Sequence, residues 1–260
     1  MFAIRLGVPE MLKLWTDLSH TQRTRKTGRM IRSRYPIGQM EKVDMAEQIK
    51  SKERVQKHGE VFTPAWMVEK MLAEAGIQAK LRDIHATFLE PSAGEGAFLT
   101  AILRQKLAHV NQSPSSRGAH WQYNALWALA SIYGIEYLPD NLAQARANML
   151  RVFAENYQAK TGRALNAGSD LYQSARFLIE KNIVQGNTLT HRNALDERIR
   201  FSEWRQDARR RRQVRRLEFA YDDLFADAQA DGMNLFARAE QEDSPPQAID
   251  LLQVWKLEAV

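Results

Sequence analysis

Short apolar runs alternate with longer helical patterns between residues 63 and 187. Residues 86–89, 132–136 and 182–185 are apolar runs bounded by turn residues, which is typical of strands buried on both faces. Between these runs, apolar residues recur at helical spacing. Strands that alternate with helices in this way predict a parallel, doubly wound α/β sheet that binds its ligand at the carboxyl ends of the strands.

The helical patterns have recognisable ends. Thr63 is placed to cap a helix, Pro64 suits its first position, and Gly76 can end it. Pro139 opens another helix directly after the second strand. Further helices are expected from residue 98 to 107, over 121–130 and over 171–180, with a surface loop over 111–120.

The two ends of the chain lack this pattern. Residues 1–50 form a basic extension that suits an arm, a partner-binding helix or a DNA contact. After residue 190 the sequence becomes arginine-dense and then acidic, and we expect helices or an irregular extension there. The expected organisation is therefore an extension over 1–50, an α/β domain over 51–190 and a second extension over 191–260.

The composition is that of an ordinary globular protein, with 44% hydrophobic and 26% charged residues. No apolar run approaches the roughly 20 residues that cross a bilayer, and the N-terminus does not resemble a secretory signal. The chain has no cysteine, and its 6 histidines are scattered, so neither disulfides nor a metal site are expected. We therefore expect a cytoplasmic protein.

Charge is segregated along the chain. Residues 1–60 hold 13 Lys/Arg against 7 Asp/Glu, residues 191–216 hold 10 against 4, and residues 217–260 hold 2 against 10. Such blocks suit a basic surface for a polyanion and an acidic tail that screens it, or simply two solvated charged faces.

Two features suggest a nucleotide-like ligand. Gly94 and Gly96 lie between the first strand and its helix, where small residues allow close approach and the helix N-terminus offers free N–H groups. Glu136 ends the second strand, where Rossmann-like sheets place a carboxylate that accepts ribose hydroxyls. Each also has a simpler explanation, as tight packing for the glycines and as a solvated charge for Glu136. The 46 residues from Glu90 to Glu136 exceed the roughly 20 of a compact unit, so 111–120 and its neighbouring helix are an insertion.

Four segments in order resemble the motif series of N6-adenine DNA methyltransferases, especially the modification subunits of restriction systems and related short "subunit M" proteins. The resemblance covers residues 58–190. The segments are Gly59-Glu60-Val61-Phe62-Thr63-Pro64, the stretch from Phe88 to Leu99, Tyr133-Gly134-Ile135-Glu136 and Ile183-Val184-Gln185-Gly186-Asn187. The resemblance implies a Rossmann-like fold that binds S-adenosylmethionine.

The resemblance also implies roles for individual residues. Thr63 and Pro64 would touch the methionine end of the cofactor, Glu136 would hold the ribose, and Tyr137 would border the adenine ring. The methionine moiety would be surrounded by the loop residues Glu90, Pro91, Ser92, Gly94 and Gly96. Thr63 has the alternative of being only a helix cap, and Tyr137 that of being only a core aromatic.

The chain departs from the family pattern in two places. Asn187 stands where the family usually carries an aspartate near the adenine, which keeps hydrogen bonding but adds no charge. The catalytic signature, Asn, Asp or Ser followed by Pro-Pro and an aromatic, is not found after Asn187. Ser244-Pro245-Pro246 is the one weak candidate, and it is followed by Gln247 instead of an aromatic residue. Its alternative is a linker turn. The signature matters because a flipped adenine amine must be held in line with the methyl group.

An arginine-rich segment is the candidate for nucleic-acid contact. It comprises Arg205, Arg209, Arg210, Arg211, Arg212, Arg215 and Arg216. Four consecutive arginines on a helix would point in every direction, so they suit sequence-independent phosphate contacts or a solvated helix paired with the acidic tail.

Three functions stay open at this point. The first is a DNA adenine methyltransferase, or a methyltransferase-like subunit, that works with DNA and with a protein partner supplying catalytic or target-recognition parts. The second is a non-catalytic protein that keeps the cofactor fold to hold nucleic acid or another subunit. The third is a methyltransferase for a small molecule or a protein.

Overall fold

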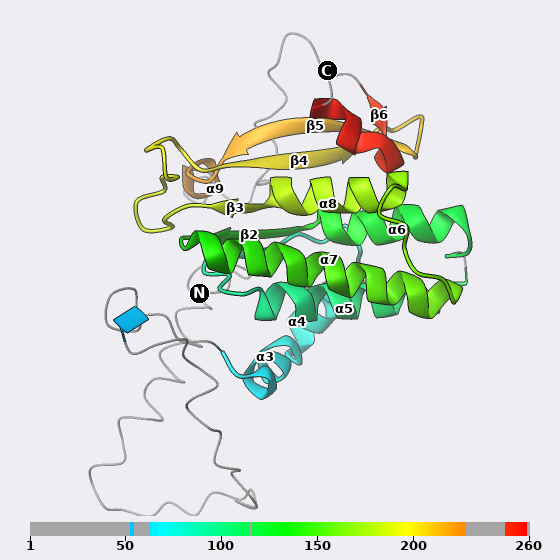
Figure 1. Ribbon diagram of the computed structural model, residues 1–260, viewed down its shortest axis with the longest axis horizontal. Helices are drawn as coiled ribbons and strands as arrows, with labels where there is room; N and C mark the ends of the chain where they lie inside the picture. Colours follow the sequence, from blue (N-terminus) through cyan, green and yellow to red (C-terminus); the bar gives the residue numbers. More distant parts are fainter. Residues whose placement is uncertain (1–52, 55–62, 115, 227–247, 259–260) are drawn as a thin grey trace, which may run out of the picture.

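The structure is a computed structural model that describes residues 53–54, 63–114, 116–226 and 248–258 (Figure 1). The order of its elements is α3 (Ala65–Leu72), α4 (Ala75–Leu81), β1 (Phe88–Glu90), α5 (Ala97–Gln112), α6 (Ala119–Ala130), β2 (Ile132–Glu136), α7 (Pro139–Thr161), α8 (Asp170–Asn182), β3 (Ile183–Gln185), β4 (Arg200–Gln206), β5 (Gln213–Ala220), α9 (Asp223–Ala226), β6 (Ile249–Asp250) and the 3-10 helix η5 (Leu251–Glu258).

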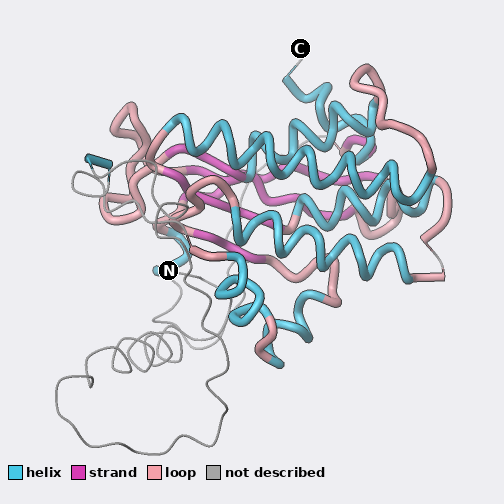
Figure 2. Tube along the Cα trace, turned by 60° about the horizontal axis from the view of Figure 1, so that its bottom comes forward, coloured by secondary structure: helices cyan, strands magenta, loops and turns pink. Residues whose placement is uncertain are grey.

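Strands β1, β2 and β3 form a parallel sheet in that spatial order. Glu90 pairs with Gly134, and Glu136 pairs with Gln185, so the carboxyl ends of the three strands reach the same edge. Helices α5 and α7 leave this edge and run back along the sheet (Figure 1), and Figure 2 shows helices packed beside the layer of strands. The prediction of a mixed α/β fold with a parallel sheet is confirmed.

Strand β2 is buried along its whole length because both of its faces are covered. On one face, Gly134 lies so close to α5 that an added Cβ would be 3.1 Å from Leu99 Cδ1. On the other face, Tyr133 and Ile135 pack in an aromatic cluster with Phe201 from β4. The alternation of side chains along a strand thus places the helices and a second sheet on opposite sides of β2.

The second sheet corrects the expectation for the C-terminal extension. Residues 200–206 and 213–220 are not helical or irregular but form an antiparallel hairpin, and β6 pairs with β5. In Figure 1 this hairpin lies on the side of β3 and α8 away from α5 and α7. The apolar positions Trp204, Val214 and Leu217 are buried, and the arginines between them obscured this strand pattern in the sequence.

The hydrophobic core continues past residue 190. Trp204 of β4, Val214 of β5, and Leu251 and Val254 of η5 belong to the same buried cluster as the inner faces of α6 and α8. Asn182 joins these parts inside the core: its Nδ2 donates to Ala130 O at 2.9 Å, and its Oδ1 accepts from Trp204 Nε1 at 3.0 Å. The hairpin and η5 are therefore part of the packed body.

The first predicted helix is interrupted. Pro64, not Thr63, precedes α3, and no side chain caps this helix. The helical conformation is interrupted at residues 73–74, and α4 begins at Ala75. Gly76 therefore lies inside a helix instead of ending one. The backbone of Glu74, with φ of −57° and ψ of 134°, leaves the helical conformation before α4. The interruption that was expected at Gly76 therefore lies at Glu74.

The start of α7 follows the prediction, with Pro139 at its first turn. Gly162 ends this helix with a φ of 71°, and its N–H donates to Gln158 O. Leu142, Ala145 and Met149 form its buried side.

In the part of the chain that the structure describes, no helix combines the length and the apolar character needed to cross a membrane.

Lys106 is fully buried beneath the sheet. Its Nζ donates to Ala86 O and to Ser131 Oγ, each at 2.6 Å, and to Ile84 O at 3.3 Å. The amine thus joins the segment before β1 to the turn before β2. Burial lowers the pKa of Lys106 from 10.5 to about 7, and the negative charge of Asp83 opposes this shift.

This pKa makes stability depend on pH. Between about pH 7 and pH 10.5 the unfolded chain holds a proton that folded Lys106 has lost, so this residue makes the free energy of unfolding rise with pH. We expect Lys106→Met to remove that rise, while Lys160→Met, at an exposed lysine, should keep it. Denaturant titrations from pH 7 to 10 measure the effect, and parallel curves for wild type and Lys106→Met would contradict it.

Candidate functional site

The carboxyl edge of the parallel sheet carries a tight loop between β1 and α5. Ala93 N–H donates to Ile135 O at 2.9 Å, which ties this loop to β2, and Gly96 N–H donates back to Ala93 O at 2.8 Å. Gly94 and Gly96 have φ angles of 54° and 84°. Both glycines therefore occupy the left-handed region that other residues rarely adopt.

Glu136 meets this loop from the end of β2. Its side chain is only 8% exposed, Oε2 accepts from Gly94 N–H at 2.7 Å, and Oε1 accepts from Leu138 N–H at 2.9 Å. The structure therefore brings together the two features that the sequence suggested separately. A carboxylate has about four acceptor positions, so each oxygen keeps capacity for one further donor.

The first residues of the loop have different environments. Glu90 is buried, and its Oε1 accepts from Ser92 N–H at 3.2 Å. Burial raises the pKa of Glu90 to about 7, and the Ser92 N–H opposes this shift. Pro91 is buried beside it, whereas the Ser92 side chain is exposed. This edge thus holds two acidic side chains, and that of Glu90 is partly protonated near neutral pH.

Gly96 also has a packing role. A Cβ added here would lie 3.2 Å from both Cα and Cβ of Ala145, so the glycine allows α5 to start against α7. Asn148, one turn further along α7, donates to Glu95 O at 2.9 Å. Helix α7 therefore holds the loop from behind, and tight packing explains Gly96 at least as well as ligand approach does.

Tyr137 follows Glu136 and points outward. Its side chain is 55% exposed, which excludes the alternative that it is a core aromatic. Its carbonyl accepts from Gln185 Nε2 at 3.2 Å, which joins the ends of β2 and β3. An exposed aromatic side chain is of the kind that stacks on planar ligands.

Arg54 reaches the same edge from the N-terminal side and was not singled out in the sequence. Its guanidinium pairs with Asp140 at 3.0 Å and donates to Asn141 Oδ1 at 3.4 Å, both in the first turn of α7. A lone arginine far from the motif series carried no signal that would have identified this contact.

Asn187 is used by its own loop. Its Oδ1 accepts from Leu189 N–H at 2.9 Å and from Thr190 N–H at 3.4 Å, which is an Asx turn. Asn193 forms a second Asx turn in the same loop, in which its Oδ1 accepts from Leu195 N–H at 2.9 Å. The expected contact between Asn187 and an adenine would therefore depend on its amide nitrogen.

The loop from 187 to 199 is tightly braced and presents apolar side chains. Leu189 and Leu195 are 90% and 78% exposed. His191 and Asp196 have positive φ, and the His191 ring pairs with Asp222. Asp222 also pairs with Arg198, and these hydrogen bonds hold the pKa of Asp222 below its ordinary value. His191 and Arg198 precede β4, and Asp222 follows β5. These contacts therefore fix the loop to the open end of the hairpin.

Thr63 and Pro64 lie at the entry to α3. Pro64 O accepts from Met67 N–H and Val68 N–H, and α3 packs on α5. Within the described ranges, no hydrogen bond joins either residue to Gly94 or Glu136. The structure therefore does not bring these two residues into the Gly94–Glu136 contact. Ser244, Pro245 and Pro246 lie outside the described residues.

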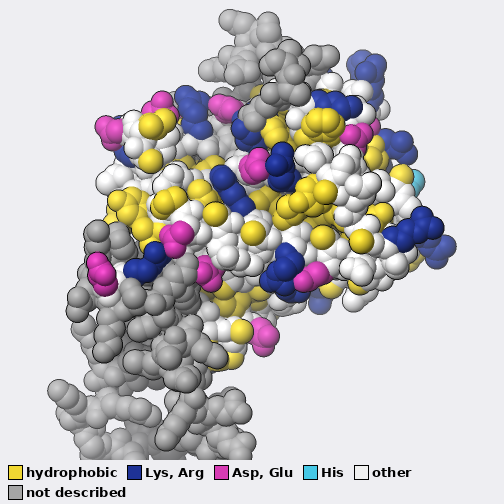
Figure 3. Space-filling view, viewed as in Figure 1, with side chains coloured by type: hydrophobic (Ala, Val, Ile, Leu, Met, Phe, Trp, Pro, Cys, Tyr) yellow, Lys and Arg dark blue, Asp and Glu magenta, His cyan; other side chains and the backbone are white. Residues whose placement is uncertain are grey.

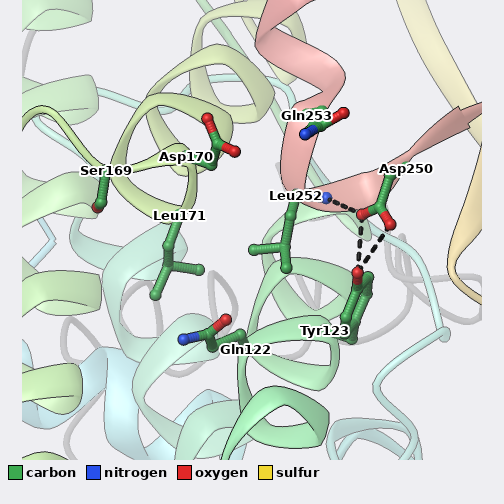
Figure 4. A pocket seen from close by; sticks show the side chains of 8 residues that line it. All are labelled: Gln122, Tyr123, Ser169, Asp170, Leu171, Asp250, Leu252 and Gln253. Atoms are coloured by element: carbon green, nitrogen blue, oxygen red, sulfur yellow. Dashed lines mark hydrogen bonds between the residues drawn. The ribbon is translucent and has the colours of Figure 1, made fainter.

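Among the cavities lined by described residues, the two with the best-defined walls do not include Gly94 or Glu136. One, of about 470 Å³, lies beside the end of β3 and the braced loop, between Gln185 and Arg200. The other, of about 290 Å³, lies between α6, the start of α8 and η5, where Tyr123 donates to Asp250 at 2.8 Å (Figure 4). The described residues contain no group of three or more His, Asp or Glu side chains placed to hold a metal ion.

Comparison with known proteins yields no relative: no protein-family model, no curated protein and no solved structure matches the chain.

Proposed function

We propose that the chain binds S-adenosylmethionine at the carboxyl edge of β1 and β2, as the cofactor-binding part of a DNA adenine-N6 methyltransferase or a methyltransferase-like subunit. The observation that carries this proposal is the Glu136 carboxylate beside the Gly94 N–H, at the edge where two parallel strands end. In Rossmann-like sheets this is where the first glycine loop and the second-strand acid meet around a nucleoside.

The residues at this edge have the chemistry that the cofactor needs. The remaining acceptor capacity of Glu136 suits the two ribose hydroxyls, and exposed Tyr137 suits the adenine face. The N-terminus of α5 lies at this edge, and helix N-termini favour anionic groups, so it suits the carboxylate of the methionine part. S-Adenosylmethionine would supply the methyl group, and these side chains would bind and orient it.

Methyl transfer needs further groups. The segment that follows β3 is the braced loop and the β4–β5 hairpin, and it contains no Pro-Pro signature. We therefore propose that a protein partner supplies the catalytic or target-recognition parts.

A calorimetric titration of the full chain with S-adenosylmethionine tests the proposal. We expect saturable binding by the wild type and at least about tenfold weaker binding by Gly94→Val, a loss of about 1.4 kcal/mol. Valine at a φ of 54° is strained, and its side chain would obstruct the approach to the loop backbone. Glu136→Gln should also weaken binding, because the neutral amide is a poorer acceptor for ribose hydroxyls.

Gly162→Val is the matched control. Gly162 has a φ of 71° and nothing within 4 Å of an added Cβ, so it carries the same backbone strain at the far end of α7. Binding by Gly162→Val should equal wild type at temperatures where both are folded. A wild type that releases no heat with the cofactor, or equal losses in the two valine variants, would refute the proposal.

A non-catalytic role is the second candidate, and the Asx turn at Asn187 favours it. The side-chain oxygen that would face the adenine is already engaged with Leu189 and Thr190 N–H groups. A chain that binds the cofactor but leaves DNA free of N6-methyladenine by mass spectrometry, even with its partner present, would establish this role.

A further inference from the structure

The turn between β4 and β5 presents a group of arginines on a braced support. Asp207 Oδ1 accepts from Arg209 N–H at 2.9 Å and Arg210 N–H at 3.0 Å, and Gln206 Nε2 donates to Arg211 O at 2.6 Å. Arg209, Arg210, Arg211 and Arg212 are all exposed. The sequence suggested a helix for these residues, but the hairpin directs them away from the core at one tip.

The arginines of the hairpin fall into two classes. Those on the strands have carboxylate partners: Arg205 with Glu203 at 2.8 Å, Arg215 with Asp207 at 3.0 Å, and Arg216 with Glu218 at 2.8 Å. These partners offset the repulsion between Arg205 and Arg215, which lie directly opposite each other across the strands. The strand arginines are therefore largely neutralised in place.

The turn arginines are not neutralised in this way. None of Arg209, Arg210 and Arg211 forms an ion pair within 4.0 Å with any acid among the described residues. The Arg210 guanidinium donates to Gln213 Oε1 at 3.4 Å, and its charge acts on the Asp207 carboxylate only from a longer distance. The Arg212 guanidinium instead lies 5.2 Å from the centre of the Tyr123 ring. Three consecutive positive charges are left facing solvent.

This turn lies at the end of the molecule opposite to the Gly94–Glu136 edge. Strand β4 starts beside the loop that follows β3 and runs away from it for six residue steps, about 20 Å. Near the turn, Trp204 contacts Asn182, the last residue of α8, and Arg212 contacts Tyr123 on α6. Figure 1 shows the turn and the loop after β3 at opposite ends, and Figure 3 shows Lys and Arg side chains around the turn end.

We propose that Arg209, Arg210 and Arg211 bind the phosphate backbone of a nucleic acid, at a site separate from the cofactor edge. Guanidinium groups match phosphate oxygens bidentately, and a row of such groups suits a chain of phosphates. The turn from 206 to 213 contains no large apolar side chain, which a membrane-binding loop would need. The site does not rest on cofactor binding and stays in place if S-adenosylmethionine does not bind.

The test is fluorescence anisotropy of a labelled 25-base-pair DNA of random sequence, titrated with the full chain at several salt concentrations. Three phosphate contacts should contribute about −2.7 to the slope of log K against log salt, which is about a 40-fold loss of affinity between 50 and 200 mM salt. We expect Arg209→Gln/Arg210→Gln/Arg211→Gln to remove this part of the slope. Arg209→Lys/Arg210→Lys/Arg211→Lys should retain most of it.

Arg104→Gln/Arg151→Gln/Arg176→Gln is the matched control, since it removes the same charge from helical arginines that pair with Glu155 or Glu180. Its salt slope should stay close to wild type, and saturating S-adenosylmethionine should leave the DNA affinity unchanged. An equal loss of slope in both glutamine triples would overturn the proposal, as would absence of DNA binding or tighter binding to phosphatidylserine vesicles than to DNA. A cofactor effect above about threefold would contradict the separate location.

Discussion

Asn182→Leu is expected to lower the free energy of unfolding by about 4 kcal/mol, since two buried groups would lose their partners at roughly 1–3 kcal/mol each. These groups are Ala130 O and Trp204 Nε1, which a fully buried Asn182 joins at 2.9 and 3.0 Å. Leucine has a similar size but neither donates nor accepts. Denaturant unfolding followed by circular dichroism measures the loss.

Two comparisons make this prediction specific. Asn111→Leu removes an acceptor from the indole of Trp121, which it contacts at 2.7 Å, but Asn111 is half-buried, so water can replace it and the expected loss is only about 1 kcal/mol. Trp204→Phe added to Asn182→Leu should cost less than the sum of the single changes, because the orphaned indole N–H is gone. Additive costs, or similar losses at Asn111 and Asn182, would contradict the role of this buried bridge.

Gly186→Ala is expected to lower the free energy of unfolding by about 2–3 kcal/mol through overpacking, although alanine is the smallest possible addition. An added Cβ would lie 2.4 Å from Ile199 Cδ1 and 2.7 Å from its Cγ1, and Ile199 is buried. Both residues flank the braced loop, so the change strains the junction between β3 and β4. Thermal unfolding of the variant measures the effect.

A double-mutant cycle identifies the cause. Ile199→Ala alone should destabilise by about 2–4 kcal/mol, but combined with Gly186→Ala the total should fall at least about 1 kcal/mol short of the sum, since the clash is removed. Gly168→Ala is the control, because its added Cβ would be 3.5 Å from Asn166 Oδ1, an ordinary contact. A strictly additive pair would show that Gly186 is required for some reason other than Ile199.

The parallel sheet was predictable because its strands are buried on both faces and appear as short apolar runs. The run 132–136 matches β2 at both ends, and Pro139 marks the start of α7. The C-terminal hairpin was not predictable in the same way. Its buried positions, such as Trp204 and Val214, are separated by arginines whose charge suggested a solvated helix, and only pairing with another strand shows which side faces inward.

The candidate site was predictable only in part. The proximity of Gly94 and Glu136 follows from a general rule, since carboxyl ends of parallel strands meet at one edge. The uses of Asn187 and Gly186 do not follow from any motif: one closes a local turn, and the other makes room for Ile199. Arg54 reaches the edge through a contact 86 residues distant in the sequence, which no local pattern indicates.

The shared core has a practical consequence for dividing this chain into fragments. A polypeptide ending near residue 190 would contain the parallel sheet but would lack Trp204, Val214 and Leu251, which cover the inner sides of α6 and α8. Such a fragment would expose the apolar surface that these residues cover and would remove the Trp204 indole that donates to Asn182. Recombinant versions intended for ligand studies should therefore extend through η5, and an affinity tag is better attached at an end of the chain than inserted at the end of the motif series.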